Sequence, residues 1–261
     1  MQLLIEAVES LLSSHLDLTP VAVLAVSCLL FLVFTRRAKR GHRFPLRAIS
    51  AYERVRQLVS QSLETGQPIH VGMGSGRVGS RATPEALMGM TLFDYVARHA
   101  AAHNQSVLGT TADGTILSAG EGILQAARRE AGFAQGYARR ELNFYGPEPM
   151  VYAAGAMDAI SRRRHLGNIL LGRFGHEGLW IAESVQDQGM VQLGGTTAPS
   201  AIAVMQTTLD ESVVGEEVFA AGAYLHRPSH LGSLATQDAM RVIAILVIIA
   251  AVVMTSLGYL S

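Results

Sequence analysis

The stretch IHVGMGSGRVGSRATPE, residues 69–85, decides the fold of this chain. It begins with an apolar segment typical of a buried strand. A glycine-rich loop follows, in which Gly74, Gly76 and Gly79 fit the pattern G-x-G-x-x-G. Residues 83–85, TPE, then supply an N-cap, a proline for the first helical position and an acid for the first turn. The stretch therefore predicts a strand, a loop and a helix, as at the start of a nucleotide-binding α/β domain.

Outward from this unit, apolar strands alternate with helical patterns, which indicates βαβ units and a mostly parallel sheet. The predicted strands are 69–72, 106–110, 142–145, 168–171 and 191–193. The predicted helices are 49–64, 84–103, 116–131, 150–163, 199–207 and 213–225. The segment 179–188 fits a strand or a helix equally well. The expected fold class is α/β, a mostly parallel sheet with flanking helices.

Two uncharged segments near the ends of the chain are long enough to cross a bilayer as helices. The first is Leu18–Phe34, for which a cleaved signal peptide is the alternative. The second is Val242–Leu260, which follows Arg241 and has Tyr259 near a membrane interface. These segments divide the chain into an amphipathic tail (1–17), a transmembrane helix (18–35), a basic linker (36–48), a cytosolic α/β domain (49–228) and a helix (229–261) that continues into the second transmembrane helix.

Basic residues cluster directly after the first apolar segment: Arg36, Arg37, Lys39, Arg40, Arg43 and Arg47. The tail before that segment has acids and no Lys or Arg. Because basic flanks stay on the cytoplasmic side, we expect an inner (cytoplasmic) membrane protein with its α/β domain in the cytoplasm and both termini outside. The lipid bilayer is an expected partner, since juxtamembrane basic residues also attract anionic lipids.

Composition excludes several classes of function. The 261 residues include 21 Lys and Arg against 21 Asp and Glu, and Cys28 is the single cysteine. One cysteine excludes an intrachain disulfide and a cysteine-based zinc site. The α/β domain offers no basic face for nucleic acid. His99 and His103 have helical metal-ligand spacing but lack an H-E-x-x-H glutamate, so no metal site is predicted.

The loops expected at the carboxyl ends of the strands, where open α/β sheets bind ligands, are rich in glycine and small polar residues. Such loops let a ligand approach the backbone and leave N–H groups for an anion. The predicted ligand-binding residues are Gly74, Ser75, Gly76, Arg77, Thr110, Thr111, Asp113, Gly194, Gly195 and Thr196. A dinucleotide cofactor is not specified, because the acid that should follow a second strand is missing. We expect these loops to lie together as one rim, at the carboxyl edge of the sheet, that binds a small anionic ligand.

Three functions fit this rim. In the leading hypothesis the domain self-assembles or scaffolds a partner at the membrane and binds the anionic ligand, with a small-residue face at 220–223 for close packing in a homo-oligomer. The alternative is an enzyme acting on a nucleotide-like or acidic small molecule, using Ser75, Arg77, Asp113 and Glu177. No catalytic residue is assigned, because the loop does not match a nucleophile elbow. A pure scaffold is favoured if side chains fill the rim.

Four motifs carry a resemblance: PIHVGMGSG (68–76), GPEPMVYAAGAMD (146–158), LGGTTAPSA (193–201) and VVGEEVFAAGAYLHRPSHLGSLATQD (213–238). With an apolar segment at each end, they resemble a family of uncharacterised bacterial membrane proteins that contain a domain of unknown function. The likeness extends from about Phe44 to the C-terminus. It implies an inner-membrane protein with a cytosolic Rossmann-like domain, and it carries over no catalytic residue.

Overall fold

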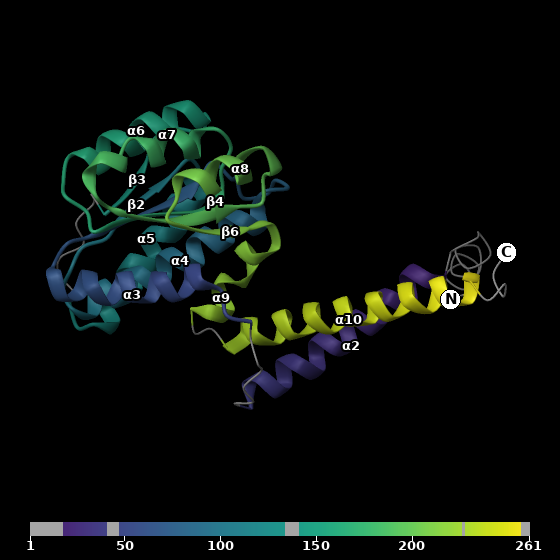
Figure 1. Cartoon of the computed structure of the whole chain (residues 1–261). Coiled ribbons are helices and arrows are strands. Elements are labelled where there is room, and N and C mark those ends of the chain that lie inside the picture. The colour runs from purple at the N-terminus through teal and green to yellow at the C-terminus, as the bar shows by residue number, and fades with distance from the viewer. Residues whose placement is uncertain (1–17, 41–46, 134–140, 226–227, 257–261) are drawn as a thin grey trace, which may run out of the picture. The chain divides into compact units, whose positions relative to one another are not determined.

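The computed structural model describes residues 18–40, 47–133, 141–225 and 228–256 (Figure 1). The chain divides into two compact units. One comprises residues 46–226 and is called the central unit below. The other combines 1–45 with 227–261 and is called the terminal unit. The predicted amphipathic tail, 1–17, lies outside the described residues.

The central unit is built on a six-stranded, all-parallel sheet with strand order β3-β2-β1-β4-β5-β6. The strands are β1 (Ile69–Gly74), β2 (Leu108–Thr111), β3 (Leu142–Phe144), β4 (Gly167–Arg173), β5 (Val191–Thr196) and β6 (Glu211–Val214). This order is that of a Rossmann-type doubly wound sheet. The predicted α/β fold with a parallel sheet is confirmed.

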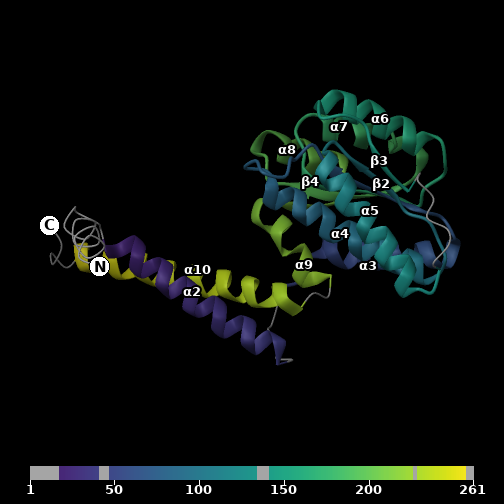
Figure 2. The same cartoon turned by 180° about the vertical axis from the view of Figure 1, so that it is seen from behind.

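Helices cover both faces of the sheet, as Figures 1 and 2 show from opposite sides. One layer holds α3 (Ser50–Thr65), α4 (Thr83–Ala102) and α5 (Gly114–Glu130). The other holds α6 (Pro149–Ser161), α7 (Glu177–Glu183) and α8 (Pro199–Thr208). Because both faces are covered, every residue of β1 is buried and its sequence shows no polar alternation.

The helix predicted over 213–225 is wrong. Residues Glu211–Val214 form β6, Gly215–Ala220 form a 3-10 helix, and only Ala221–Tyr224 form a short α-helix, α9. The β-branched Val213 pairs with Gly195 of β5, which extends the sheet by one edge strand. Gly215 then ends that strand with a φ of 58°. The ambiguous segment 179–188 is helical at its start, because α7 runs to Glu183.

Glycines inside the elements bring α4 and the sheet into close contact. A Cβ on Gly89 of α4 would lie 2.6 Å from the carbonyl oxygen of Leu171 in β4. A Cβ on Gly109 of β2 would lie 2.6 Å from the ring of Phe93, which is fully buried on α4. Gly89 therefore lets α4 pack closely against Leu171 of β4 and Met73 of β1, near the carboxyl ends of both strands.

The terminal unit is a pair of helices, α2 (Leu18–Lys39) and α10 (Pro228–Ser256), which lie side by side in both views (Figures 1 and 2). Each contains a segment long and apolar enough to cross a membrane, Pro20–Lys39 and His230–Ile249. Only 6% and 11% of these segments are buried, whereas the core helix of a soluble protein is mostly buried. The second segment begins earlier than the predicted Val242–Leu260, whose last residues, 257–260, are outside the described range.

Candidate functional site

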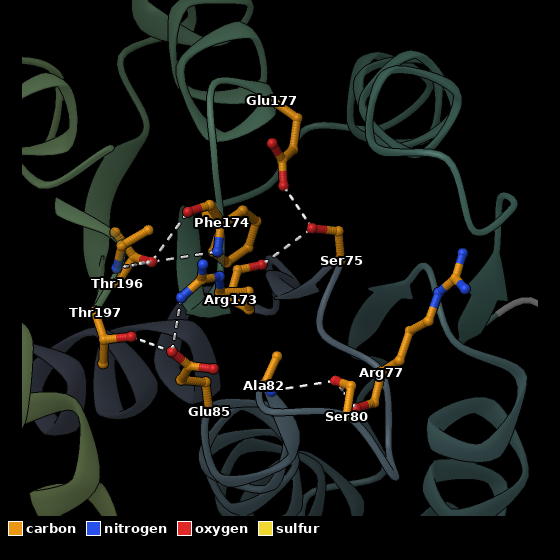
Figure 3. A network of polar contacts seen from close by, with 11 residues as sticks. Ser75, Arg77, Ser80, Ala82, Glu85, Arg173, Phe174, Glu177, Thr196 and Thr197 are labelled. Carbon is orange, nitrogen blue, oxygen red and sulfur yellow. Dashed lines mark hydrogen bonds and ion pairs between the residues drawn. The ribbon is translucent and has the colours of Figure 1, made fainter. Parts of the chain in front are cut away.

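The strand order places a topological switch point between β1 and β4. From β1 the chain moves outward to β2 and β3, and then returns to build β4, β5 and β6 on the other side. In open α/β sheets, ligands bind outside the carboxyl ends of the strands at such a point. The loops that meet here are Ser75–Ala82, after β1, and Phe174–His176, after β4 (Figure 3).

Hydrogen bonds from Ser75 join the ends of β1 and β4 at this switch point. The N–H of Ser75 donates to the carbonyl oxygen of Arg173 at 2.9 Å, which continues the pairing of β1 with β4. The Ser75 hydroxyl donates to Oε1 of Glu177 at 2.6 Å. Glu177 is the first residue of α7 and is buried. The loop that follows Ser75 lies next to this hydrogen-bonded layer.

That loop is shaped by its own serine and threonine. The Ser80 hydroxyl donates to the carbonyl of Arg77 at 2.7 Å and accepts from the N–H of Ala82 at 3.1 Å. Gly79, with a φ of 87°, donates its N–H to the hydroxyl of Thr83 at 2.9 Å. Thr83 was predicted to cap α4, but it is the first helical residue, and Ala82 at the N-cap provides no side-chain cap. The N–H of Thr83 donates to the carbonyl of Ser80 at 3.1 Å, so the loop itself covers the start of α4.

A buried carboxylate ties three elements together below the loop. Glu85, in the first turn of α4, accepts from Nη1 of Arg173 at 3.2 Å and from the hydroxyl of Thr197. Its second oxygen, Oε2, is enclosed and has no hydrogen-bond partner among the described residues. The Arg173 side chain is 45% exposed, so its guanidinium reaches from the buried acid to the solvent side. Figure 3 shows these residues around the switch point.

Arg77 and Arg81 are exposed on the β1–α4 loop, whereas Glu85 and Glu177 are buried. The exposed acid Glu148 follows Pro147 and caps α6 by accepting from the N–H of Val151. Arg77 extends away from Arg173 and donates weakly to the carbonyl of Pro147 at 3.4 Å (Figure 3). The loop can therefore present cationic side chains and backbone N–H groups to an anion.

Three of the other predicted ligand-binding side chains bond the backbone of the protein itself. Asp113 caps α5 by accepting from the N–H groups of Thr115 and Ile116 at 2.9 and 3.0 Å. The Thr111 hydroxyl accepts from the N–H of Asp113 at 3.2 Å and is buried. The Thr196 hydroxyl is also buried and bonds the backbone of Phe174.

Gly194 and Gly195 lie inside β5, where a Cβ would come within 2.1 Å of the Leu170 carbonyl and 2.2 Å of the Val213 carbonyl, respectively. Both glycines therefore serve close strand pairing in this structure. Of the predicted residues, Gly74, Ser75, Gly76 and Arg77 lie together at the switch point, and Thr196 joins them through its bonds to Phe174. The part of all the predicted residues in ligand binding stays a prediction.

A buried polar chain runs across the sheet beneath the switch point. The Gly74 N–H donates to the Tyr152 hydroxyl at 3.4 Å, which lies 3.1 Å from the Thr110 hydroxyl. Thr110 lies 2.9 Å from Nε2 of His70, whose Nδ1 lies 2.6 Å from Oδ1 of Asn168. Because Oδ1 only accepts, Nδ1 carries the proton and Nε2 accepts from Thr110. With a neutral imidazole, every side chain in this hydrogen-bonded series then has a partner.

Burial lowers the pKa of His70 to about 3 because the charged imidazolium would lose its hydration. The hydrogen bond to Asn168 acts in the opposite direction, and the positive charge of His165 lowers the pKa further. Burial likewise raises the pKa of the Tyr152 hydroxyl. His70 and Tyr152 thus stay neutral at physiological pH and hold the polar chain in one hydrogen-bonding pattern.

The described groups around Ser75 match a serine-nucleophile site only in part. A serine nucleophile needs an adjacent base and N–H donors for the oxyanion. Ser75 has a carboxylate partner in Glu177, but its own N–H is occupied by Arg173. His176 is exposed at the N-cap of α7. No cluster of three or more His, Cys, Asp or Glu side chains suited to a metal ion occurs in the described ranges.

The sequence analysis missed Arg173 as part of this site, placed Thr197 in the rim only by its loop, and identified Glu85 only as a first-turn acid. One feature of the sequence could have identified Arg173 as a site residue, namely its position just after a predicted strand. Nothing in the sequence pairs Arg173 with Glu85, because 88 residues separate them.

A family model described as "Domain of unknown function (DUF6754)" matches residues 10–261. No curated protein and no protein of solved structure matches the sequence. The matched range includes both apolar helices and the whole central unit.

Proposed function

The chain belongs to this family of unknown function, and from its geometry we propose that it is a membrane-anchored binding domain for a small phosphorylated or carboxylated ligand. The observation that carries the proposal is the position of the glycine-rich loop Ser75–Ala82 at the switch point of an all-parallel sheet. At that position, related sheets hold the anionic groups of their ligands. The exposed charges on this loop are those of Arg77 and Arg81.

The membrane anchor is the pair of apolar helices in the terminal unit. Their length and low burial support crossing a bilayer, and the basic residues Arg36, Arg37 and Lys39 end the first of them. We place these residues at the cytoplasmic surface of an inner membrane, with the central unit in the cytoplasm. The ligand is then sensed in the cytoplasm by a domain that cannot diffuse away from the membrane.

Labelling of an introduced cysteine tests this topology. With Cys28→Ala as the background, Gln2→Cys is expected to react in intact cells with a thiol reagent that does not cross membranes. A second variant, Ser60→Cys on the exposed surface of α3, is expected to react only after lysis. The opposite pattern would place the central unit outside the cytoplasm.

Ligand-induced stabilisation tests the binding function. Inorganic pyrophosphate and a panel of nucleotides are added to the full chain in detergent, and the unfolding temperature is measured. A ligand at 100 times its Kd stabilises the folded protein by about 2.7 kcal/mol. We expect such a shift in the natural protein and its loss in Arg77→Glu, which replaces an attractive charge with a repulsive one.

Two further variants make this test specific. Gly76→Val is also expected to abolish the shift, since a Cβ at Gly76 would lie 2.9 Å from Cβ of Arg173 and displace the loop. Arg129→Glu, an equal charge change on the exposed end of α5, is expected to leave the shift intact. An unchanged shift in both Arg77→Glu and Gly76→Val would show that the ligand binds elsewhere.

The enzyme alternative is supported by one contact, the 2.6 Å hydrogen bond from the Ser75 hydroxyl to Glu177. If this pair activates a nucleophile, Ser75→Ala abolishes turnover of a bound ligand and leaves its binding intact. If Ser75→Ala leaves the fate of every bound ligand unchanged, the site acts by binding alone.

A further inference from the structure

Two contacts fix how α2 lies against α10. The Ser27 hydroxyl donates to the carbonyl of Val23 at 2.7 Å, and its oxygen lies 3.6 Å from Sδ of Met240. A Cβ on Gly232 would lie 2.6 Å from Cα of Thr35, so the two backbones approach closely there. Eight residues separate the two contact positions on each helix, which corresponds to about 12 Å. The helices therefore run antiparallel in a single, consistent register.

This register places an ion pair of α10 beside the uncharged part of α2. Asp238 lies level with Leu29, and Arg241 lies one turn further along, near the middle of the uncharged segment 18–34. The two charged groups are 3.6 Å apart, and their side chains are 55% and 50% exposed. When α2 crosses a bilayer, this pair lies at the depth of the hydrocarbon, where ionisable groups are costly and need polar surroundings.

The charged pair belongs to a polar stripe, defined here as Ser233, Gln237, Asp238 and Arg241. All four residues are exposed, and three of them recur every fourth position on one side of α10. Gly232 and Thr236 are buried, and Gly232 packs against Thr35 of α2. The stripe therefore lies on the exposed side of α10.

At the same depth, the exposed side of α2 is apolar. Its outward side chains there are Leu29, Phe31, Leu32 and Val33. The helix pair thus has one face suited to lipid and another that lipid would not solvate. A single copy cannot bury the polar stripe in the described part of the terminal unit, since α2 already covers the opposite side of α10.

We propose that the polar stripe is the contact between two copies of this chain within the membrane. The stripe carries one acid and one base, so it is complementary to itself about a two-fold axis. In such a pair, Asp238 of one copy meets Arg241 of the other, and the reverse, while Ser233 and Gln237 hydrogen-bond across the contact. The apolar side of α2 then faces lipid. This inference rests on the proposed membrane placement of the terminal unit.

Disulfide cross-linking in native membranes tests the contact. In the Cys28→Ala background, Gln237→Cys places a thiol on the stripe and Leu32→Cys places one on the apolar side of α2. We expect oxidation to give at least about tenfold more cross-linked dimer from Gln237→Cys, because its copies face each other. Equal cross-linking, or more from Leu32→Cys, would overturn the proposal.

A charge-exchange experiment separates pairing between copies from pairing within one helix. Asp238→Arg leaves two bases on each stripe, and Arg241→Asp leaves two acids. Each variant alone is expected to lose dimer by about tenfold or more, as like charges oppose across the contact. Co-expressed with different tags, the two variants are expected to form a heterodimer. Absence of that heterodimer would contradict the contact, since the pair within each helix stays broken in both variants.

Alkaline carbonate extraction distinguishes failure of this inference from failure of the membrane placement. If carbonate releases the natural protein from the membrane fraction, the membrane placement itself is wrong. If the protein and the Gln237→Cys variant both stay in the membrane and no dimer is cross-linked, only the proposed contact is wrong.

Discussion

Replacing Gly74 by alanine is expected to destabilise the central unit severely. Gly74 has a φ of 79°, a conformation that costs an L-residue about 1–2 kcal/mol. An added Cβ would also lie 2.3 Å from the carbonyl oxygen of Arg173, which is backbone and cannot rotate away. Overpacking of this kind costs about 1–3 kcal/mol more. The combined loss is a large part of the stability of an ordinary domain.

Gly79→Ala is the matched control, because it isolates the backbone conformation from the clash. Gly79 has a φ of 87°, and no atom lies within 4 Å of the position of its added Cβ. We expect Gly79→Ala to cost only the conformational part, about 1–2 kcal/mol. Urea unfolding of the full chain in detergent, followed by the fluorescence of the single tryptophan, Trp180 on α7, measures both variants. Equal losses would show that β1 and β4 separate easily at the switch point.

The second large effect is a loss of stability in acid caused by His70. Its pKa of about 3 in the folded protein lies below the ordinary value of 6.5. Between these two values the unfolded chain binds a proton that the folded chain does not. The free energy of unfolding therefore rises with pH across this window and falls as the pH drops below 6.5. The slope approaches about 1.4 kcal/mol per pH unit in the middle of the window.

Two variants separate the titration of His70 from its hydrogen bonds. His70→Gln keeps a donor and an acceptor but removes the titrating group, so its stability is expected to depend much less on pH between 4 and 6. Thr110→Val removes the donor to Nε2 and costs about 1–3 kcal/mol at pH 7. It retains the slope, because the imidazole is still buried. Free energies of unfolding, measured for both variants from pH 4 to 7, show whether the pH dependence comes from the titration of His70. An unchanged slope in His70→Gln would assign the acid sensitivity to other groups, such as His165, whose pKa burial also lowers.

Local patterns were sufficient to predict most elements of the sheet. The strand 69–72 and the helix 84–103 were predicted within two residues at each end, because glycine, proline and the apolar periodicity act within a few residues of the chain. The helix predicted over 213–225 was wrong for the same reason. Its small residues and acids suit a helix locally, but pairing of Val213 with β5 takes precedence.

The candidate site was harder to predict because it depends on contacts between distant segments. In the sequence, Gly194 and Gly76 look equivalent, because each follows a predicted strand. In the structure, Gly194 is pressed against the backbone of β4, whereas Gly76 opens the β1–α4 loop. Thr110 reads as a rim residue but points into the sheet toward His70. Strand order decides which loops meet, and no local pattern specifies it.

The central claim is that the loop Ser75–Ala82 binds an anionic ligand above the closed switch point. A density map of the full chain in lipid nanodiscs, prepared with saturating pyrophosphate, tests it most directly. We predict density for the anion against the N–H groups of residues 76–78 and the guanidinium of Arg77. Density only in a different place, such as the cavity of about 740 Å³ lined by Arg54, Gln192 and Asp210, would contradict the claim, as would an empty loop.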